Sequence, residues 1–227
     1  MLKVEKEMGK DEKDKNGEFA LSELDRMSSG LCLPEELKEK VGIMYQKAVE
    51  KGLVKGRRVE TVLGTLIYAL SREHGSPRLM SEICNIAGVD KREFGRNYRY
   101  VASKLNIRVI PSTAMAYVPR CATLLEMDDK VQTRANAYLK ALKANRGFSG
   151  KGPIGLAAAT LYIAAIMNNN LVSQRGVAEA IGVTEVTVRN RCTDIAKALE
   201  IEDEVNTRIK EIGAIQKEQN QAAKLKY

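Results

Sequence analysis

The sequence contains an internal duplication: residues 56–107 align without a gap on residues 150–201, displaced by 94 positions. Identical residues recur along the alignment, as at Tyr68 and Tyr162. Solenoid repeats span only about 20–50 residues, so a unit of this length is a whole domain. We therefore expect two related domains, and the positions where the copies differ are the candidates for function.

Composition narrows the class of protein. With 227 residues, the chain is long enough for two domains that each bury a core. A net charge of +8 favours an anionic partner such as nucleic acid. The four cysteines are far apart and form no CxxC pair, which predicts small buried hydrophobes in a reducing compartment and neither disulfides nor a zinc site.

No signal peptide is visible, because residues 1–18 are charged throughout. The longest apolar run, Ile154 to Met167, is shorter than the roughly 20 residues that span a bilayer. It is typical of a helix buried on all sides. We expect a cytoplasmic protein that binds no membrane.

Apolar residues recur at helical spacing with few strand signals, which predicts an all-α fold. We expect a charged, disordered leader over 1–18, repeat 1 over 19–108, an extended linker over 109–118, repeat 2 over 119–201 and a polar tail over 202–227 that adds one helix. The helices expected in repeat 1 are Phe19–Met27, one that starts near Pro34 and ends before Gly52, Val59–Arg72, Leu79–Ala87 and Lys91–Leu105.

The end of each repeat has the pattern of a helix-turn-helix. In repeat 2 a helix over Ser173–Ile181 is followed by a turn at Gly182, which suits a left-handed backbone, and by a helix over Glu185–Leu199. Thr184 is expected to cap the second helix. Repeat 1 carries a capping-box pattern from Asp90 to Glu93 in the same place.

The second helix of repeat 2 separates into two faces. Its buried stripe is expected to be Val188, Cys192, Ile195 and Leu199, which leaves a polar outer face of Val186, Thr187, Arg189, Asn190, Arg191 and Thr193. In a major groove valine can meet a thymine methyl group and arginine can bind guanine. Val186 and Arg189 lie at the start of the helix, the part of a recognition helix that reaches bases. A plain helical hairpin with solvated charges stays open as the alternative.

The outer face of repeat 1 differs, because Arg92 and Gly95 replace Val186 and Arg189. Its stripe of Phe94, Tyr98, Val101 and Leu105 matches the core of repeat 2, whereas Lys91, Arg92, Arg96 and Arg99 form a basic face. Such a face suits phosphates or an acidic protein surface, not base reading. A solvated basic face is the open alternative.

Several segments resemble the core domain of archaeal transcription factor B, the counterpart of eukaryotic transcription factor IIB. The similarity covers Phe19 to Ile201 and is carried by the segments 19–27, 48–53, 95–100, 117–120, 147–151, 155–159 and 182–191. The resemblance implies two cyclin-like repeats of five helices and binding to the complex of TATA-binding protein with promoter DNA. It also implies that the helix-turn-helix of repeat 2 reads the B recognition element.

Residue roles follow from that resemblance. Val186 and Arg189 would read bases, and Gly56 and Arg57 would approach DNA on the other side. The remaining candidates for DNA are Thr184, Thr187, Arg191 and Gln174, and those for phosphates or protein partners are Lys91, Arg92, Arg96, Arg58, Arg78 and Lys151. No residue is assigned to the contact with TATA-binding protein.

The sequence also departs from the family pattern. No zinc ribbon, the part that docks on RNA polymerase, is present, and the one histidine, His74, is expected to be an ordinary helix-end residue. This predicts a variant or competing regulator with weak polymerase recruitment, or the core of a longer factor. Gly176 lies inside a helix, at a cost of about 0.5–1 kcal/mol. Cys192 stands where an aromatic is expected.

Two other classes of function are alternatives to a DNA-binding transcription factor. A cyclin-like module that binds a protein such as a kinase, and no DNA, is the alternative function. An enzyme is disfavoured, because one histidine provides no catalytic set and Gly150–Gly152 lacks the spacing of a phosphate-binding loop. The Asp128–Asp129 pair is explained by helix capping. We expect a non-enzymatic protein without cofactors or metals that is monomeric when free.

Overall fold

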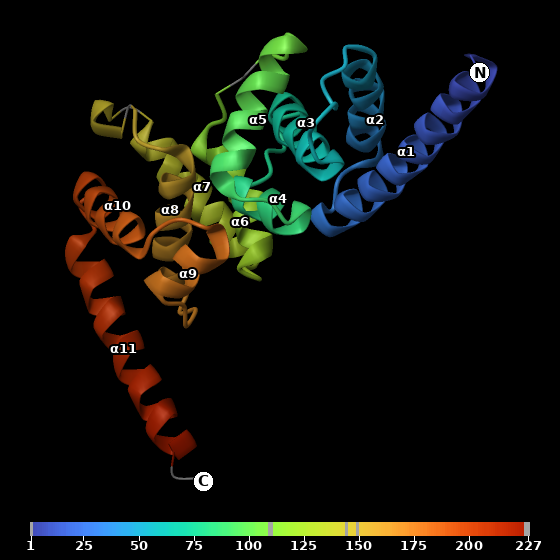
Figure 1. Cartoon of the computed structure of the whole chain (residues 1–227). Helices are drawn as coiled ribbons and strands as arrows, with labels where there is room; N and C mark the ends of the chain where they lie inside the picture. Colours follow the sequence, from blue (N-terminus) through green and yellow to red (C-terminus); the bar gives the residue numbers. More distant parts are fainter. Residues whose placement is uncertain (1, 109–110, 144, 149, 225–227) are drawn as a thin grey trace. The chain divides into compact units, whose positions relative to one another are not determined.

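The computed structural model describes the backbone of residues 2–108, 111–143, 145–148 and 150–224 (Figure 1). Side chains are described from residue 17 to 215 within these ranges, apart from that of Arg146. This part of the chain contains helices and no strand, which confirms the expected all-α fold. It divides into two compact units, residues 1–111 and 112–227.

Each unit is built from five matching helices. Unit 1 contains α1 (Leu2–Leu31), α2 (Glu35–Glu50), α3 (Val59–Glu73), α4 (Met80–Ala87) and α5 (Lys91–Lys104). Unit 2 contains α6 (Ala114–Leu124), α7 (Asp129–Leu142), α8 (Pro153–Met167), α9 (Gln174–Ile181) and α10 (Glu185–Ala198), a short 3-10 helix (Arg146–Phe148), and α11 (Glu202–Lys224). The first residues of α2 to α5 recur in α7 to α10, displaced by the 94 positions of the sequence repeat, and the last residues of α3 to α5 recur in α8 to α10 in the same way.

One helix lies at the centre of each unit. In α3 every residue from Thr61 to Ser71 is buried, and α1, α2, α4 and α5 pack against it. In α8 every residue from Gly155 to Met167 is buried beneath α6, α7, α9, α10 and α11. The expectation that the apolar run is a helix buried on all sides is confirmed.

The N-terminal segment differs from the prediction of a disordered leader. The backbone is helical from Leu2, so α1 is much longer than the helix expected over Phe19–Met27. Lysine and glutamate favour helix, and no proline interrupts the segment, so its charge does not prevent helix formation. The C-terminal part of α1 packs into the core of unit 1, where Met27 and Leu31 are fully buried.

The extended linker is also shorter than predicted. Residues 109–110 lie outside the described residues, and α6 already begins at Ala114, before Pro119. The Thr113 hydroxyl caps this helix by accepting the Ala116 N–H at 3.3 Å. Tyr117 and Val118 are buried, and this burial outweighs the tendency of a residue before proline to leave the helical region.

Candidate nucleic-acid interface

The helix-turn-helix of unit 2 has the local structure that the sequence predicts. Gly182 takes a left-handed conformation with φ 80° between α9 and α10. The Ser173 hydroxyl caps α9 by accepting the Gly176 N–H at 2.9 Å, and the Thr184 hydroxyl caps α10 by accepting the Thr187 N–H at 3.1 Å. Unit 1 repeats the plan, with Gly88 in the turn and the Asp90 carboxylate capping α5.

The buried face of α10 packs on α8. Val188, Cys192 and Ile195 are buried as predicted, and Leu199 is half-buried. The Cys192 thiol lies 3.7 Å from the Ala159 carbonyl oxygen, and burial raises its pKa to about 12. Cys192 is therefore a small core residue in its thiol form.

The outer face of α10 presents the expected reading pair. Val186 is 59% exposed, which is unusual for a large apolar residue, and Arg189 is exposed as well. The Arg189 guanidinium donates to the Glu185 carboxylate and, at 3.4 Å, to Oε1 of Gln174 on α9. The structure thus brings Gln174, Val186 and Arg189 together across both helices of the motif.

Two other DNA candidates are engaged within the fold. Thr187 is half-buried, and a Cβ at Gly155 of α8 would lie only 2.9 Å from its methyl carbon, so the glycine allows α10 to approach. Its hydroxyl lies 2.7 Å from that of Thr184. The Arg191 guanidinium donates to Oδ2 of Asp194 at 2.8 Å. These contacts make Thr187 and Arg191 parts of the framework that holds the motif.

Lys151, a candidate for phosphate binding, is paired with the same carboxylate. Its Nζ lies 2.6 Å from Oδ2 of Asp194 and 4.7 Å from the centre of the Phe148 ring. The hydrogen bond from Lys151, followed by that from Arg191, lowers the pKa of Asp194 below its ordinary value. The negative charge of Asp194 therefore offsets two of the predicted cations.

Replacing Asp194 with asparagine is expected to lower stability in a pH-dependent way. Because the pKa of Asp194 is lower in the folded chain, its ion pairs stabilise the fold above the ordinary carboxyl pKa, and this is lost as the pH falls through the folded value. At pH 7 the loss is expected to be about 1 kcal/mol, since the carboxylate is partly exposed.

Urea denaturation of Asp194→Asn and the parent chain between pH 7 and about pH 3 measures this difference. The difference should shrink below about pH 4. A difference that stays constant with pH would show that the charge of Asp194 is not its source.

The basic surface of unit 1 has a groove of about 530 Å³ between the loop before α3 and the outer face of α5. Its lining residues are Lys55, Gly56, Arg57, Arg58, Glu93, Arg96, Asn97 and Tyr100. Lys91, Arg92 and Arg96 are exposed as expected. Arg58 is partly used internally, because it donates to the carbonyl oxygens of Ala87 and Gly88 and to Glu60. Gly56 is exposed with φ 71°, which favours glycine.

Arg78 is not available to a phosphate, contrary to the prediction. The residue is 5% exposed, and its guanidinium donates to the carbonyl oxygens of Leu31, Cys32 and Ser76 and to the Ser76 hydroxyl. These contacts hold the turn between α1 and α2, where Cys32 has a φ of 50°. The sequence shows the charge of Arg78 but not its burial.

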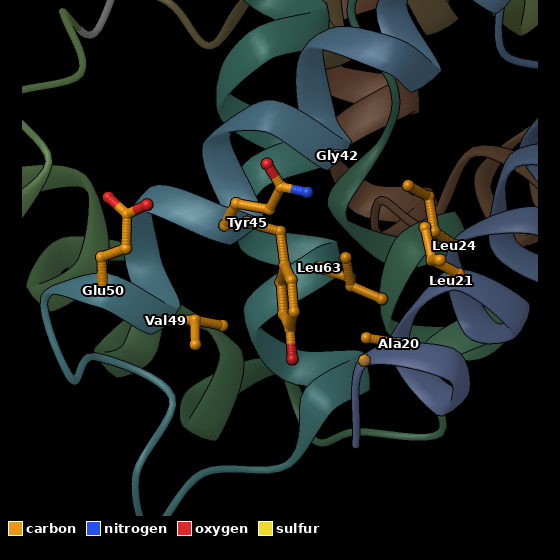
Figure 2. Close-up of a pocket in the computed structure, with 10 residues that line it drawn as sticks. Ala20, Leu21, Leu24, Gly42, Tyr45, Val49, Glu50 and Leu63 are labelled. Atoms are coloured by element: carbon orange, nitrogen blue, oxygen red, sulfur yellow. The ribbon is translucent and has the colours of Figure 1, made fainter. Parts of the chain in front are cut away.

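An apolar groove of about 360 Å³ between α1 and α2 was missed by sequence reasoning (Figure 2). Figure 2 shows Tyr45 and Val49 of α2 facing Leu21 and Leu24 of α1, with Leu63 of α3 between them. Neither phosphates nor base edges suit such a lining. The sequence feature that could have revealed this groove is that α1 and α2 carry more apolar residues than the core buries. Leu21, for example, is 61% exposed.

Other chemistry finds little support in the described part of the chain. No group of three or more histidine, cysteine, aspartate or glutamate residues there could hold a metal ion. His74 ends α3, as expected, and Asp128 caps α7. Cys32 is exposed, which corrects the expectation that all four cysteines are buried. Among the described residues, no helix is both long and apolar enough to cross a membrane.

The fold defines the class of protein: two tandem cyclin-like helical repeats, with a helix-turn-helix at the end of each. The family described as "Transcription factor TFIIB repeat" matches residues 14–104 and 108–198. The chain therefore belongs to the TFIIB family, whose members are transcription factors and not enzymes.

Curated relatives of the chain agree with this family assignment. The chain is 43% identical to transcription initiation factor IIB of Archaeoglobus fulgidus over 189 residues, which are 83% of this chain and 58% of that protein. It is 42% identical to the protein of the same name from Methanococcus maripaludis over 192 residues, 85% of this chain and 57% of the relative. The chain thus spans less than two thirds of the length of these relatives.

Proposed function

We propose that this protein acts in transcription initiation by binding promoter DNA together with TATA-binding protein. Family membership supports this function, and the names of the relatives support the step at which it acts. We expect the free protein to be monomeric. RNA polymerase is a further proposed partner.

The proposed DNA-reading surface is the start of α10, which would read the B recognition element. The observation that carries this proposal is the exposed pair of Val186 and Arg189 in the first turns of the second helix of a helix-turn-helix. Valine there can meet a thymine methyl group and arginine can bind guanine. In the free protein the Arg189 guanidinium donates to the Glu185 carboxylate and, at 3.4 Å, to Oε1 of Gln174 on α9.

Arg189→Ala is expected to weaken the ternary complex with TATA-binding protein and promoter DNA by about 5- to 150-fold, corresponding to about 1–3 kcal/mol for a bidentate base contact. Gel shifts on duplexes with and without the recognition element measure this. The loss should be confined to the duplex that carries the element. Arg175→Ala, which removes an exposed arginine on α9, is the matched control. Equal losses on both duplexes would contradict base reading by Arg189.

The regulatory proposal, a variant or competing factor, is tested separately by transcription in vitro. A competitor should reduce the output of a system driven by a full-length factor in proportion to its concentration. Full support of initiation by this chain alone would contradict that role.

A protein-interaction module is the second candidate, and the apolar groove between α1 and α2 favours it. Such a groove accepts apolar side chains of a protein partner. A duplex that is unshifted under all salt conditions, with and without TATA-binding protein, would support this candidate over DNA binding.

A further inference from the structure

The two units contain the same junction, built with different chemistry. In each unit a cation in the loop before the central helix reaches the outer helix of the helix-turn-helix. The cation is Arg57 in unit 1 and Lys151 in unit 2, which are equivalent positions of the repeat. Arg57 contacts Asn97 and Tyr100, and Lys151 contacts Asp194, the equivalent of Tyr100.

In unit 2 the junction is occupied by ion pairs. Lys151 and Arg191 both bind Oδ2 of Asp194, at 2.6 and 2.8 Å. The side chains of these two cations are only 24% and 28% exposed. An incoming phosphate would have to compete with a carboxylate that both cations already hold, so this junction is a poor anion site.

In unit 1 the junction is held by neutral groups. The Arg57 guanidinium lies over the Tyr100 ring, 4.2 Å from its centre, and its Nε donates to Oδ1 of Asn97 at 3.1 Å. Its Nη1 donates to the carbonyl oxygens of Leu53 and Lys55. Within the described residues Nη2 makes no hydrogen bond and no carboxylate pairs with the guanidinium, so Arg57 keeps its full charge and two N–H donors.

The surroundings of Arg57 add to the positive field. Lys55, Arg58 and Arg96 line the same groove, and Glu93 is the one acidic residue in the lining. A groove with this excess of positive charge attracts an anion, and the fixed guanidinium loses little conformational freedom on binding it. The geometry suits one phosphate of a nucleic-acid backbone at Nη2 of Arg57.

We propose that Tyr100 and Asn97 are positioning residues that hold Arg57 ready for a phosphate of promoter DNA without neutralising it, so that the unit 1 junction binds DNA while the unit 2 junction is structural. This inference rests on the proposed function. It adds two positioning residues to the DNA contact that the resemblance implies for Arg57, and it separates the role of position 100 from that of the equivalent position 194.

The test introduces into unit 1 the carboxylate that unit 2 has at the equivalent position. Tyr100→Asp places a carboxylate beside Arg57, and Tyr100→Phe keeps the ring. Affinity of the full chain for TATA-binding protein on promoter DNA is measured at several salt concentrations, because each lost phosphate contact lowers the slope of log K against log salt by about 0.9. Thermal unfolding followed by circular dichroism verifies that each variant is folded.

Tyr100→Asp is expected to bind about tenfold more weakly and to lose about 0.9 of slope, as Arg57→Gln should, with no further loss in the double variant. Tyr100→Phe and the unit 2 control Lys151→Met should keep the parent slope. A parental slope for folded Tyr100→Asp, or a lost slope for Lys151→Met, would overturn the inference and leave the proposed function standing. Failure of the parent chain to form a salt-dependent complex would instead reject the proposed function.

Discussion

Arg78→Met is expected to lower the free energy of unfolding of unit 1 by about 3 kcal/mol or more. The guanidinium donates hydrogen bonds of 2.7–2.9 Å to the carbonyl oxygens of Leu31 and Cys32 in the α1–α2 turn, and bonds of 2.9–3.0 Å to the carbonyl and hydroxyl oxygens of Ser76 in the loop before α4. A hydrogen bond to a charged group contributes about 1.5–3 kcal/mol, and the carbonyl oxygens left behind would be poorly solvated. Methionine keeps much of the volume but supplies no donor, so the loss reports the hydrogen bonds.

Urea denaturation of the full chain, followed by circular dichroism, measures this loss. Arg92→Met is the matched control, because it removes the same charge from an exposed position of the same unit and should have little effect on stability. Equal and small effects of both substitutions would show that Arg78 does not hold the turn. The two variants also distinguish a loss of stability from a change in binding, since only the Arg92 variant should remain fully folded while its basic face is altered.

Phe94→Ala is expected to destabilise unit 1 by about 3–5 kcal/mol, the usual cost of truncating a buried phenylalanine. Phe94 is fully buried, and its ring meets that of Tyr68 edge to face with 5.8 Å between centres. A Cβ at Gly64 of α3 would lie 3.2 Å from the Phe94 ring, so the helices are closely packed here. Relaxation into the cavity is therefore restricted.

Hydrogen exchange of the full chain, read peptide by peptide, assigns this loss to a unit. Protection should fall over α3 to α5 and persist over α8 to α10. Val188→Ala, at the equivalent position of unit 2, should show the reverse pattern with a smaller loss, because fewer buried carbon atoms are removed at about 0.8 kcal/mol each. Loss of protection in both units on either substitution would contradict their independent cores.

Sequence reasoning located most helices because their signals are local. Gly88 and Gly182 end α4 and α9, and Asp90 and Thr184 cap the helices that follow, as predicted. These signals involve residues within about four positions of one another, so no tertiary contact is needed to recognise them. The errors fell at α1, where helix-favouring charged residues continue the helix to Leu2, and at α6, where burial of Tyr117 and Val118 keeps the chain helical before Pro119.

For the candidate site, the sequence predicted which residues of α10 are exposed but not which basic residues are paired. Exposure of Val186 and Arg189 follows from the helical period once the buried stripe is known, and the structure confirms it. The sequence could not divide the basic residues into free and paired ones, because arginine and lysine have the same charge in both cases. Arg78 and Lys151 are engaged by partners 47 and 43 positions away, and no local pattern marks such contacts.

The sequence by itself determined that this protein is a duplicated helical domain of the TFIIB family, with a helix-turn-helix at the end of each copy. Periodicity and capping are sufficient for the helices and turns, because a helix is specified by neighbours along the chain, whereas the family follows from the resemblance of particular segments. Only the tertiary structure decided which cations remain available to a partner. That depends on burial and on the side chain that lies opposite, as with Tyr100 against Asp194, and both are set by packing between helices.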